Sequence, residues 1–82
     1  MKPVEWTAPA LEDMAALDRA VSRRIKVAVE RLAETGAGDV KKLQGVDPPE
    51  FRLRSGDWRV RFDLAGDALR ILRVRNRKDA YR

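Results

Sequence analysis

The hydrophobic pattern of this chain changes its period once, and that change limits the folds available to it. Residues 11–32 place apolar side chains at helical spacing, whereas residues 50–64 alternate between apolar and polar side chains. Helical spacing predicts amphipathic helices, and alternation predicts strands that bury one face. The sequence therefore predicts an α+β fold in which helices precede an antiparallel sheet.

The first part of the chain predicts an edge strand followed by a helical hairpin. Residues 2–6 are short and alternate, which is typical of a strand at a sheet edge. Thr7 and Asp18 are suitable N-caps for two successive helices. Gly36 is suited to end the second helix as a C-terminal cap.

The last part of the chain predicts a three-stranded antiparallel meander. Residues 50–54, 58–64 and 69–75 alternate, and glycine-containing turn signals separate them. The apolar face of these strands is expected to pack on the hairpin. Because 82 residues support a single core, residues 1–82 are expected to form one domain.

The segment between the hairpin and the meander, residues 35–49, is predicted as a long loop. It contains glycines and prolines and includes Lys41 and Lys42. Long loops in compact domains are often functional, so both lysines are candidates for a binding role.

The net positive charge lies entirely in the second part of the chain. Residues 1–49 contain eight basic and eight acidic side chains, whereas residues 50–82 contain ten basic and five acidic ones. Nine of those ten basic residues are arginine, whose planar guanidinium matches phosphate. Composition alone indicates a polyanion such as nucleic acid and, with equal weight, a solvated face balanced by an acidic partner protein.

Strand parity predicts two different faces for the meander. The apolar face consists of Phe51, Leu53, Trp58, Val60, Phe62, Leu64, Leu72 and Val74. The opposite, wet face consists of Arg52, Arg54, Arg59, Arg61, Arg73 and Arg75. Six clustered cations repel one another unless an anion lies among them, which favours an anion-binding surface over an ordinary solvated face. Glu50 and Asp63 share the wet face and could pair with some of these arginines.

Several kinds of site are excluded by residue type. The chain contains neither histidine nor cysteine, which removes the usual neutral-pH base and thiolate chemistry. The spacing of its carboxylates predicts no metal site, and no cofactor is expected. No apolar run reaches the ~20 residues that span a bilayer. The expected protein is cytoplasmic and has no membrane contact.

Three segments together resemble the RelE toxins of bacterial and archaeal toxin–antitoxin pairs. They are KKLQG at residues 41–45, FRLRSGDWRVRF at residues 51–62 and RVRNRKDAYR at residues 73–82. The resemblance extends over nearly the whole chain and implies the RelE-like fold. It also implies an endonuclease that cleaves mRNA in the ribosomal A site, contacts the ribosome and its 16S RNA, and is neutralised by a cognate antitoxin.

The resemblance also implies which side chains act. The residues that match catalytic positions of the family are Arg52, Arg59, Arg77 and Tyr81. The accompanying candidates for RNA binding are Lys41, Lys42, Arg54, Arg61, Arg73, Arg75 and Lys78. The sequence departs from the family at Glu50 and Arg52, where the best-known member has lysines.

These departures leave two candidates for the general base. Arginine stays protonated and is a poor base, so the proton of the RNA 2′-OH would pass to Tyr81 or to Glu50. The cations that surround Tyr81 favour its phenolate form, so Tyr81 is the preferred candidate.

Two other functions are compatible with the same sequence. One is a ParE-like toxin that inhibits DNA gyrase without catalysis of its own, and such toxins generally lack the full basic-plus-tyrosine set. The other is a non-catalytic RNA-binding module whose arginines only hold phosphates.

Overall fold

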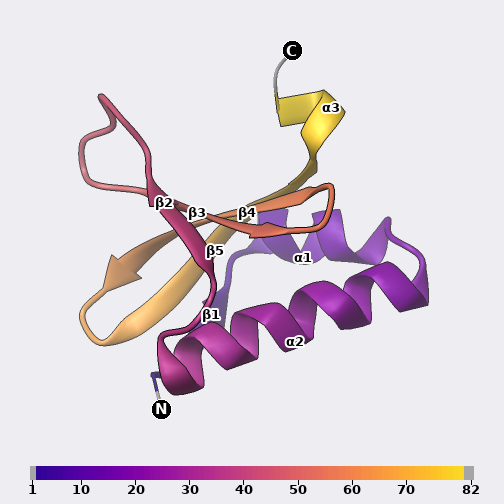
Figure 1. Ribbon diagram of the computed structural model, residues 1–82, viewed down its shortest axis with the longest axis horizontal. Helices are drawn as coiled ribbons and strands as arrows, with labels where there is room; N and C mark the ends of the chain where they lie inside the picture. The colour runs from indigo at the N-terminus through magenta and orange to yellow at the C-terminus, as the bar shows by residue number, and fades with distance from the viewer. Residues whose placement is uncertain (1, 81–82) are drawn as a thin grey trace.

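Five strands form one sheet, and two helices cover one of its faces (Figure 1). The computed structural model describes residues 2–80, with the side chains of residues 2–78. Its elements are β1 (Val4–Trp6), α1 (Ala8–Ala15), α2 (Arg19–Thr35), β2 (Asp39–Lys42), β3 (Phe51–Ser55), β4 (Trp58–Ala65), β5 (Ala68–Asn76) and α3 (Arg77–Ala80). The strand order is β1-β5-β4-β3-β2, with β1 parallel to β5 and the other pairs antiparallel. The predicted α+β class, with an N-terminal strand, a helical hairpin and a meander, is confirmed.

The caps of both long helices lie where the sequence predicts them. The Thr7 hydroxyl accepts a hydrogen bond from the Ala10 amide, and the Asp18 carboxylate accepts one from the Val21 amide at 2.9 Å. Gly36 ends α2 in the left-handed conformation, with its amide donating to the Leu32 carbonyl. These contacts satisfy main-chain groups that a helix end leaves without partners.

The prediction of a loop over residues 35–49 is wrong in part, because this segment contains β2. All four residues of β2 are exposed, and only one of them, Val40, is apolar. The strand forms because its main chain pairs with β3, from Asp39 opposite Arg54 to Lys42 opposite Phe51. An edge strand with so little buried surface has no hydrophobic alternation by which the sequence could reveal it.

The two hairpin turns of the meander each consist of a glycine and an aspartate. Gly56 and Gly66 occupy the first turn position with φ of 60° and 62°. A positive φ at this position lets a two-residue turn follow the twist of the flanking strands. Two residues therefore suffice to connect β3 to β4 and β4 to β5.

A β-bulge in β5 makes the predicted orientation of Leu72 wrong. Arg61 lies opposite Arg73 but Phe62 lies opposite Ile71, so Leu72 is the extra residue. Ile71 and Val74 are therefore the buried side chains there, and Leu72 is only half-buried. Strand parity failed at Leu72 because a bulge changes the alternation beyond it.

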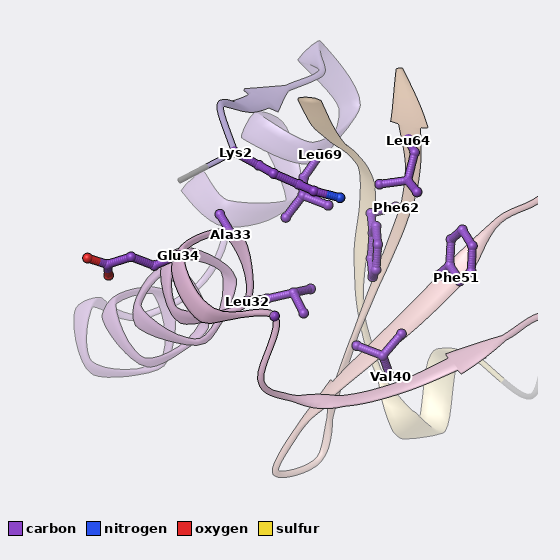
Figure 2. Close-up of a pocket in the computed structure, with 10 residues that line it drawn as sticks. Lys2, Leu32, Ala33, Glu34, Val40, Phe51, Phe62, Leu64 and Leu69 are labelled. Atoms are coloured by element: carbon purple, nitrogen blue, oxygen red, sulfur yellow. The ribbon is translucent and has the colours of Figure 1, made fainter. Parts of the chain in front are cut away.

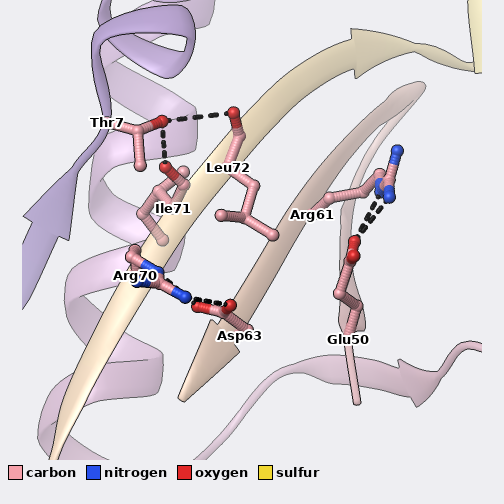
Figure 3. Close-up of polar contacts among 7 residues, drawn as sticks. All are labelled: Thr7, Glu50, Arg61, Asp63, Arg70, Ile71 and Leu72. Atoms are coloured by element: carbon pink, nitrogen blue, oxygen red, sulfur yellow. Dashed lines mark hydrogen bonds and ion pairs between the residues drawn. The ribbon is translucent and has the colours of Figure 1, made fainter. Parts of the chain in front are cut away.

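Residues at the start of α1 and within it bind the main chain around this bulge. The Thr7 hydroxyl donates to the Ile71 carbonyl at 2.7 Å and approaches the Leu72 carbonyl at 3.3 Å (Figure 3). The Asp13 carboxylate accepts a hydrogen bond from the Val74 amide at 2.8 Å. The bulge therefore exposes main-chain groups that α1 satisfies.

The core lies between α2 and the helix-facing side of the sheet. It consists mainly of Ile25, Val29, Ala33, Leu53, Val60, Phe62, Leu69, Ile71 and Val74. Phe51 and Phe62 stack across β3 and β4 with ring centroids 5.4 Å apart. Because this face is filled, the alternate residues of the same strands point to the opposite side.

Candidate functional site

Two parallel rows of arginine cross the sheet face that the helices leave uncovered. The strand register aligns Arg52, Arg61 and Arg73 in one row, with Lys41 at its β2 end. It aligns Arg54, Arg59 and Arg75 in the other, with Asp39 at the β2 end. The six arginines therefore share one face, as the alternation predicts.

The first row, which we call the paired row, is largely neutralised by carboxylates. Arg61 forms an ion pair with Glu50 (Figure 3), with its Nε 3.1 Å from Oε1. Arg73 forms a two-pronged pair with Asp13 on α1, at 2.9 and 3.1 Å. Two of its three arginines thus already have an anionic partner.

The pairing between Asp13 and Arg73 changes the protonation of both groups. Partial burial raises the pKa of the Asp13 carboxyl, but hydrogen bonds from Arg73 and the Val74 amide lower it by more. The net pKa of Asp13 lies below its ordinary value, and the pKa of Arg73 is raised by the hydrogen bond to Asp13. Both groups therefore stay charged at neutral pH.

The second row, Arg54, Arg59 and Arg75, we call the open row. No carboxylate oxygen lies within 4.0 Å of these arginines among the side chains of residues 2–78. Arg54 is within 3.5 Å only of the Gly56 carbonyl. This row therefore retains its full positive charge on the uncovered face.

Arg59 is buried, which corrects the expectation that it lies exposed on the wet face. Only 6% of its surface is exposed, and it lies between Arg54 and Arg75 in the strand register. Its NH1 donates long hydrogen bonds to the carbonyls of Gly56 and Trp58, at 3.3 and 3.4 Å. Its buried Nε has no acceptor, and neither has the Nε of Arg52. Buried donors without acceptors are rare and costly, so an anion that reached them would be well bound.

The start of α3 lies beside the β3–β4 turn, at the end of the sheet where the strand register places the open row. The Arg77 amide donates to the Asp57 carbonyl at 2.6 Å, which fixes α3 against the β3–β4 turn. The Asn76 side chain caps the Lys78 amide at 3.1 Å. Arg77 and Lys78 are both exposed there. The predicted residue Tyr81 lies outside the described residues.

The two lysines of β2 point in opposite directions. Lys41 lies opposite Arg52 and extends the paired row. Lys42 lies opposite Phe51, whose side chain faces the helices. Lys41 alone therefore adjoins the arginine rows, because neighbouring residues of a strand alternate between faces.

Sequence reasoning did not find two of the ion pairs on this face. Asp13 belongs to a helix sixty residues before Arg73, and no local pattern links them. Asp63 pairs with Arg70 rather than with one of the six arginines, at 2.8 and 2.6 Å (Figure 3). Arg70 lies directly opposite Asp63 on β5, so the register explains this pair.

The described part of the chain offers no obvious metal centre and no membrane span. Among the side chains of residues 2–78, no three acidic groups cluster as metal ligands would. None of the described helices is long and apolar enough to cross a membrane.

The family profile described as "ParE toxin of type II toxin-antitoxin system, parDE" matches residues 4–81. No curated protein matches the chain.

Solved structures share the fold. The RelB–RelE antitoxin–toxin complex from Methanococcus jannaschii contains a chain with a TM-score of 0.77 and 23% identity, over 94% of each chain. The archaeal RelE–RelB complex from Pyrococcus horikoshii OT3 matches with a TM-score of 0.74 and 24% identity, over 93% of this chain and 94% of that chain. YafQ from E. coli strain BL21(DE3) matches with a TM-score of 0.75 and 13% identity over the full length of both chains. The predicted resemblance to RelE toxins is confirmed.

Proposed function

Because the chain belongs to the ParE toxin family of type II toxin–antitoxin systems, we propose that this toxin is an endoribonuclease that cleaves mRNA in the ribosomal A site. A cognate antitoxin would hold it inactive, in line with the RelB–RelE complexes that share its fold. The observation that carries the proposal is the open row, whose charge no described carboxylate neutralises.

The open row has the properties that a phosphate-binding site requires. Arg54 and Arg75 flank Arg59 in register, and Arg77 begins α3 beside the same turn. A guanidinium donates several hydrogen bonds in a fixed plane and matches the oxygens of a phosphate. Because the buried Nε of Arg59 has no acceptor within the protein, a phosphate that reached it would supply the missing hydrogen bond.

The proposed reaction uses the 2′-OH of the RNA as the nucleophile. The 2′-oxygen forms a bond to the adjacent phosphorus as it loses its proton, and the bond from phosphorus to the 5′-oxygen breaks. The 5′-oxygen takes a proton from solvent, and a 2′,3′-cyclic phosphate and a 5′-OH result. The nucleophile is already beside the phosphate, so holding the backbone in line supplies much of the rate. The arginines of the open row would stabilise the extra charge on the phosphate oxygens, with Arg77 as a further donor.

The proton of the 2′-OH needs an acceptor, and Tyr81 is the proposed one. Glu50, the other candidate, already accepts two hydrogen bonds from Arg61 on one carboxylate oxygen. The Glu50 carboxylate is therefore already engaged by a cation of the protein. The family resemblance, which matches Tyr81 to a working position of the RelE toxins, supports the choice of Tyr81.

Cleavage of a defined mRNA on programmed ribosomes tests this proposal. Arg54→Gln should slow single-turnover cleavage about tenfold or more, because it removes one donor from the open row. Arg23→Gln is the matched control, since it removes the same charge from an exposed position on α2. Equal rates for the two variants would contradict the proposal.

The ParE description of the matched family favours a second candidate function, inhibition of DNA gyrase. A supercoiling assay with purified gyrase separates the two. Inhibited supercoiling without mRNA cleavage would establish the second candidate. Binding of RNA without cleavage and without inhibition would instead indicate a non-catalytic RNA-binding module.

A further inference from the structure

A third row of charged side chains crosses the uncovered sheet face beyond the paired row. The strand register aligns Glu5 on β1, Arg70 on β5 and Asp63 on β4, and we call this set the third row. Phe62 and Leu64, the neighbours of Asp63 on β4, line an apolar groove on the helix side of the sheet (Figure 2). By alternation the Asp63 side chain points to the uncovered face. The third row therefore lies between the paired row and the β4–β5 turn.

The charge of this face changes sign along the strands. The open row and the paired row each contain three arginines, whereas the third row contains two carboxylates and one arginine. Strand β4 shows the change directly, because it places Arg59, Arg61 and Asp63 on this face in that order toward the β4–β5 turn. The field of these side chains therefore attracts a phosphate backbone toward the β3–β4 turn and away from the third row.

Asp63 holds Arg70 in the geometry that a phosphate would need. The Arg70 Nε lies 2.8 Å from one carboxylate oxygen, and its second nitrogen lies 2.6 Å from the other (Figure 3). A guanidinium binds a phosphate through the same two parallel hydrogen bonds, so the carboxylate and a phosphate compete for it. The Arg70 side chain is 43% exposed, whereas Asp63 is only 7% exposed. A ligand on this surface would therefore meet Arg70 first and find its donors already in use.

Glu5 adds to this effect from the edge of the sheet. It is exposed and lies directly opposite Arg70 on β1. The hydrogen bond to Asp63 raises the pKa of Arg70 above its ordinary value, and the charges of Asp63 and Glu5 raise it further. Arg70 thus lies between two anionic side chains. The arginines of the open row, by contrast, have no carboxylate within 4.0 Å among the side chains of residues 2–78.

We infer that the third row ends the RNA-binding surface of this toxin. Asp63 and Glu5 withhold Arg70 from the RNA, so the phosphate backbone contacts the open and paired rows and does not extend toward the β4–β5 turn. Asp63 is a positioning residue in this scheme, because it acts on the RNA only through Arg70. The inference rests on the proposed function, which supplies RNA as the ligand. It assigns the site to a short run of the RNA backbone, whose length the third row limits.

The salt dependence of RNA binding measures how many phosphates the protein contacts. The probe is a fluorescein-labelled 2′-O-methyl oligouridylate, which lacks the nucleophilic hydroxyl and therefore is not cleaved. For a single strand, the logarithm of the binding constant falls by about 0.7 per neutralised phosphate for each tenfold rise in salt. Fluorescence anisotropy from about 50 to 200 mM KCl gives this slope. Oligomers of increasing length show where the affinity stops rising.

Asp63→Asn should release Arg70 to the RNA. The slope should then steepen by about 0.7, and the affinity should continue to rise for about one more nucleotide. Glu34→Gln is the matched control, because it removes the same charge from an exposed residue of α2 that points away from the groove (Figure 2). This control should leave the slope unchanged.

Two further variants test whether Arg70 itself makes the added contact. The double variant Asp63→Asn/Arg70→Gln lacks the released guanidinium, so its slope should return to that of the unmodified chain. A merely structural effect of Asp63→Asn would persist in the double variant. Glu5→Gln changes an exposed residue and should strengthen binding about twofold. Urea denaturation verifies folding, and Glu5→Gln decides the test by itself if Asp63→Asn is unfolded.

The outcomes separate this inference from the proposed function. Equal slopes for Asp63→Asn and the unmodified chain would overturn the inference. An equally steep slope for Glu34→Gln would also overturn it, because net charge alone would then explain the change. A double variant that keeps the steeper slope would remove the role of Arg70. Absence of oligomer binding by the unmodified chain would overturn the inference, whereas cleavage on programmed ribosomes would still decide the proposed function separately.

Discussion

The paired row and the open row contain the same kind of side chain on the same sheet face, yet their surroundings differ. Arg61 and Arg73 each contact a carboxylate, and those contacts connect the sheet to the preceding loop and to α1. Arg54, Arg59 and Arg75 have no such partner among the described side chains. An arginine that holds a carboxylate contributes to the fold, whereas an arginine left without an anion is available for a ligand. Position on the face alone would not have separated the two rows.

The largest expected effect concerns the buried member of the open row. Arg59→Met keeps the length and apolar character of the side chain and removes the guanidinium. We expect cleavage to fall about 100-fold or more, because a donor to the phosphate is lost. The free energy of unfolding should stay the same or increase, since a buried Nε without an acceptor disappears. Single-turnover cleavage and urea denaturation measure the two effects. Normal cleavage by Arg59→Met would show that the open row is no more important for activity than the paired row.

The next effect tests whether the proton acceptor lies beside the open row. Tyr81→Phe keeps the ring and removes the hydroxyl, so it separates stacking on a base from proton transfer. A positioned general base contributes about 10²–10⁴ to a rate, so we expect a loss of at least about 100-fold. The measurement is single-turnover cleavage at saturating toxin. Normal cleavage by Tyr81→Phe would limit this residue to stacking.

A substitution in the paired row should instead change the free energy of unfolding. Asp13→Asn weakens the pair with Arg73 and the hydrogen bond from the Val74 amide, so the free energy of unfolding should fall by about 1–2 kcal/mol. The folded-state pKa of Asp13 is lowered, so its ionised form stabilises the fold above the ordinary aspartate pKa of about 3.9. That contribution disappears as the pH falls through the lower, folded-state value.

Urea denaturation between pH 7 and pH 2 checks this expectation. Stability of the unmodified chain should fall more steeply below about pH 4 than stability of Asp13→Asn. The matched control is Asp18→Asn, because asparagine caps a helix nearly as well as aspartate and Asp18 contacts no arginine of the sheet. Identical acid profiles for Asp13→Asn and the unmodified chain would show that the α1 contact adds nothing to the paired row.

Local chemistry predicted much of this fold from the sequence. Thr7, Asp18 and Gly36 mark helix ends by interactions within a few residues, and strict alternation places the six arginines on one face. Strand β2 could not be predicted, because an exposed edge strand buries nothing that the pattern would record. The bulge at Leu72 could not be predicted either, because main-chain contacts with Thr7 and Asp13 accompany it and both lie far away in sequence.

The sequence predicted which arginines share the face of the candidate site, but it did not predict their ion pairs or their burial. Alternation identifies which arginines share a face, yet it cannot show that a helix residue sixty positions earlier neutralises Arg73. It also cannot show that Arg59 is buried, because alternation assigns a side chain to a face and does not give its exposed fraction. Such contacts depend on tertiary packing, which local sequence does not encode.

The smallest expected effect is at Glu50, where this chain departs from the family pattern it resembles. Glu50→Gln removes the charge that holds Arg61 and leaves an exposed arginine beside the open row. Exposed ion pairs contribute little to stability, so the melting temperature should change only slightly. Cleavage should stay unchanged or rise up to about threefold, because one more cation then faces the phosphate backbone. A rise would show that the carboxylate of the paired row restrains the enzyme. A loss comparable with that expected for Tyr81→Phe would instead make Glu50 the proton acceptor, and catalysis would then belong to the paired row.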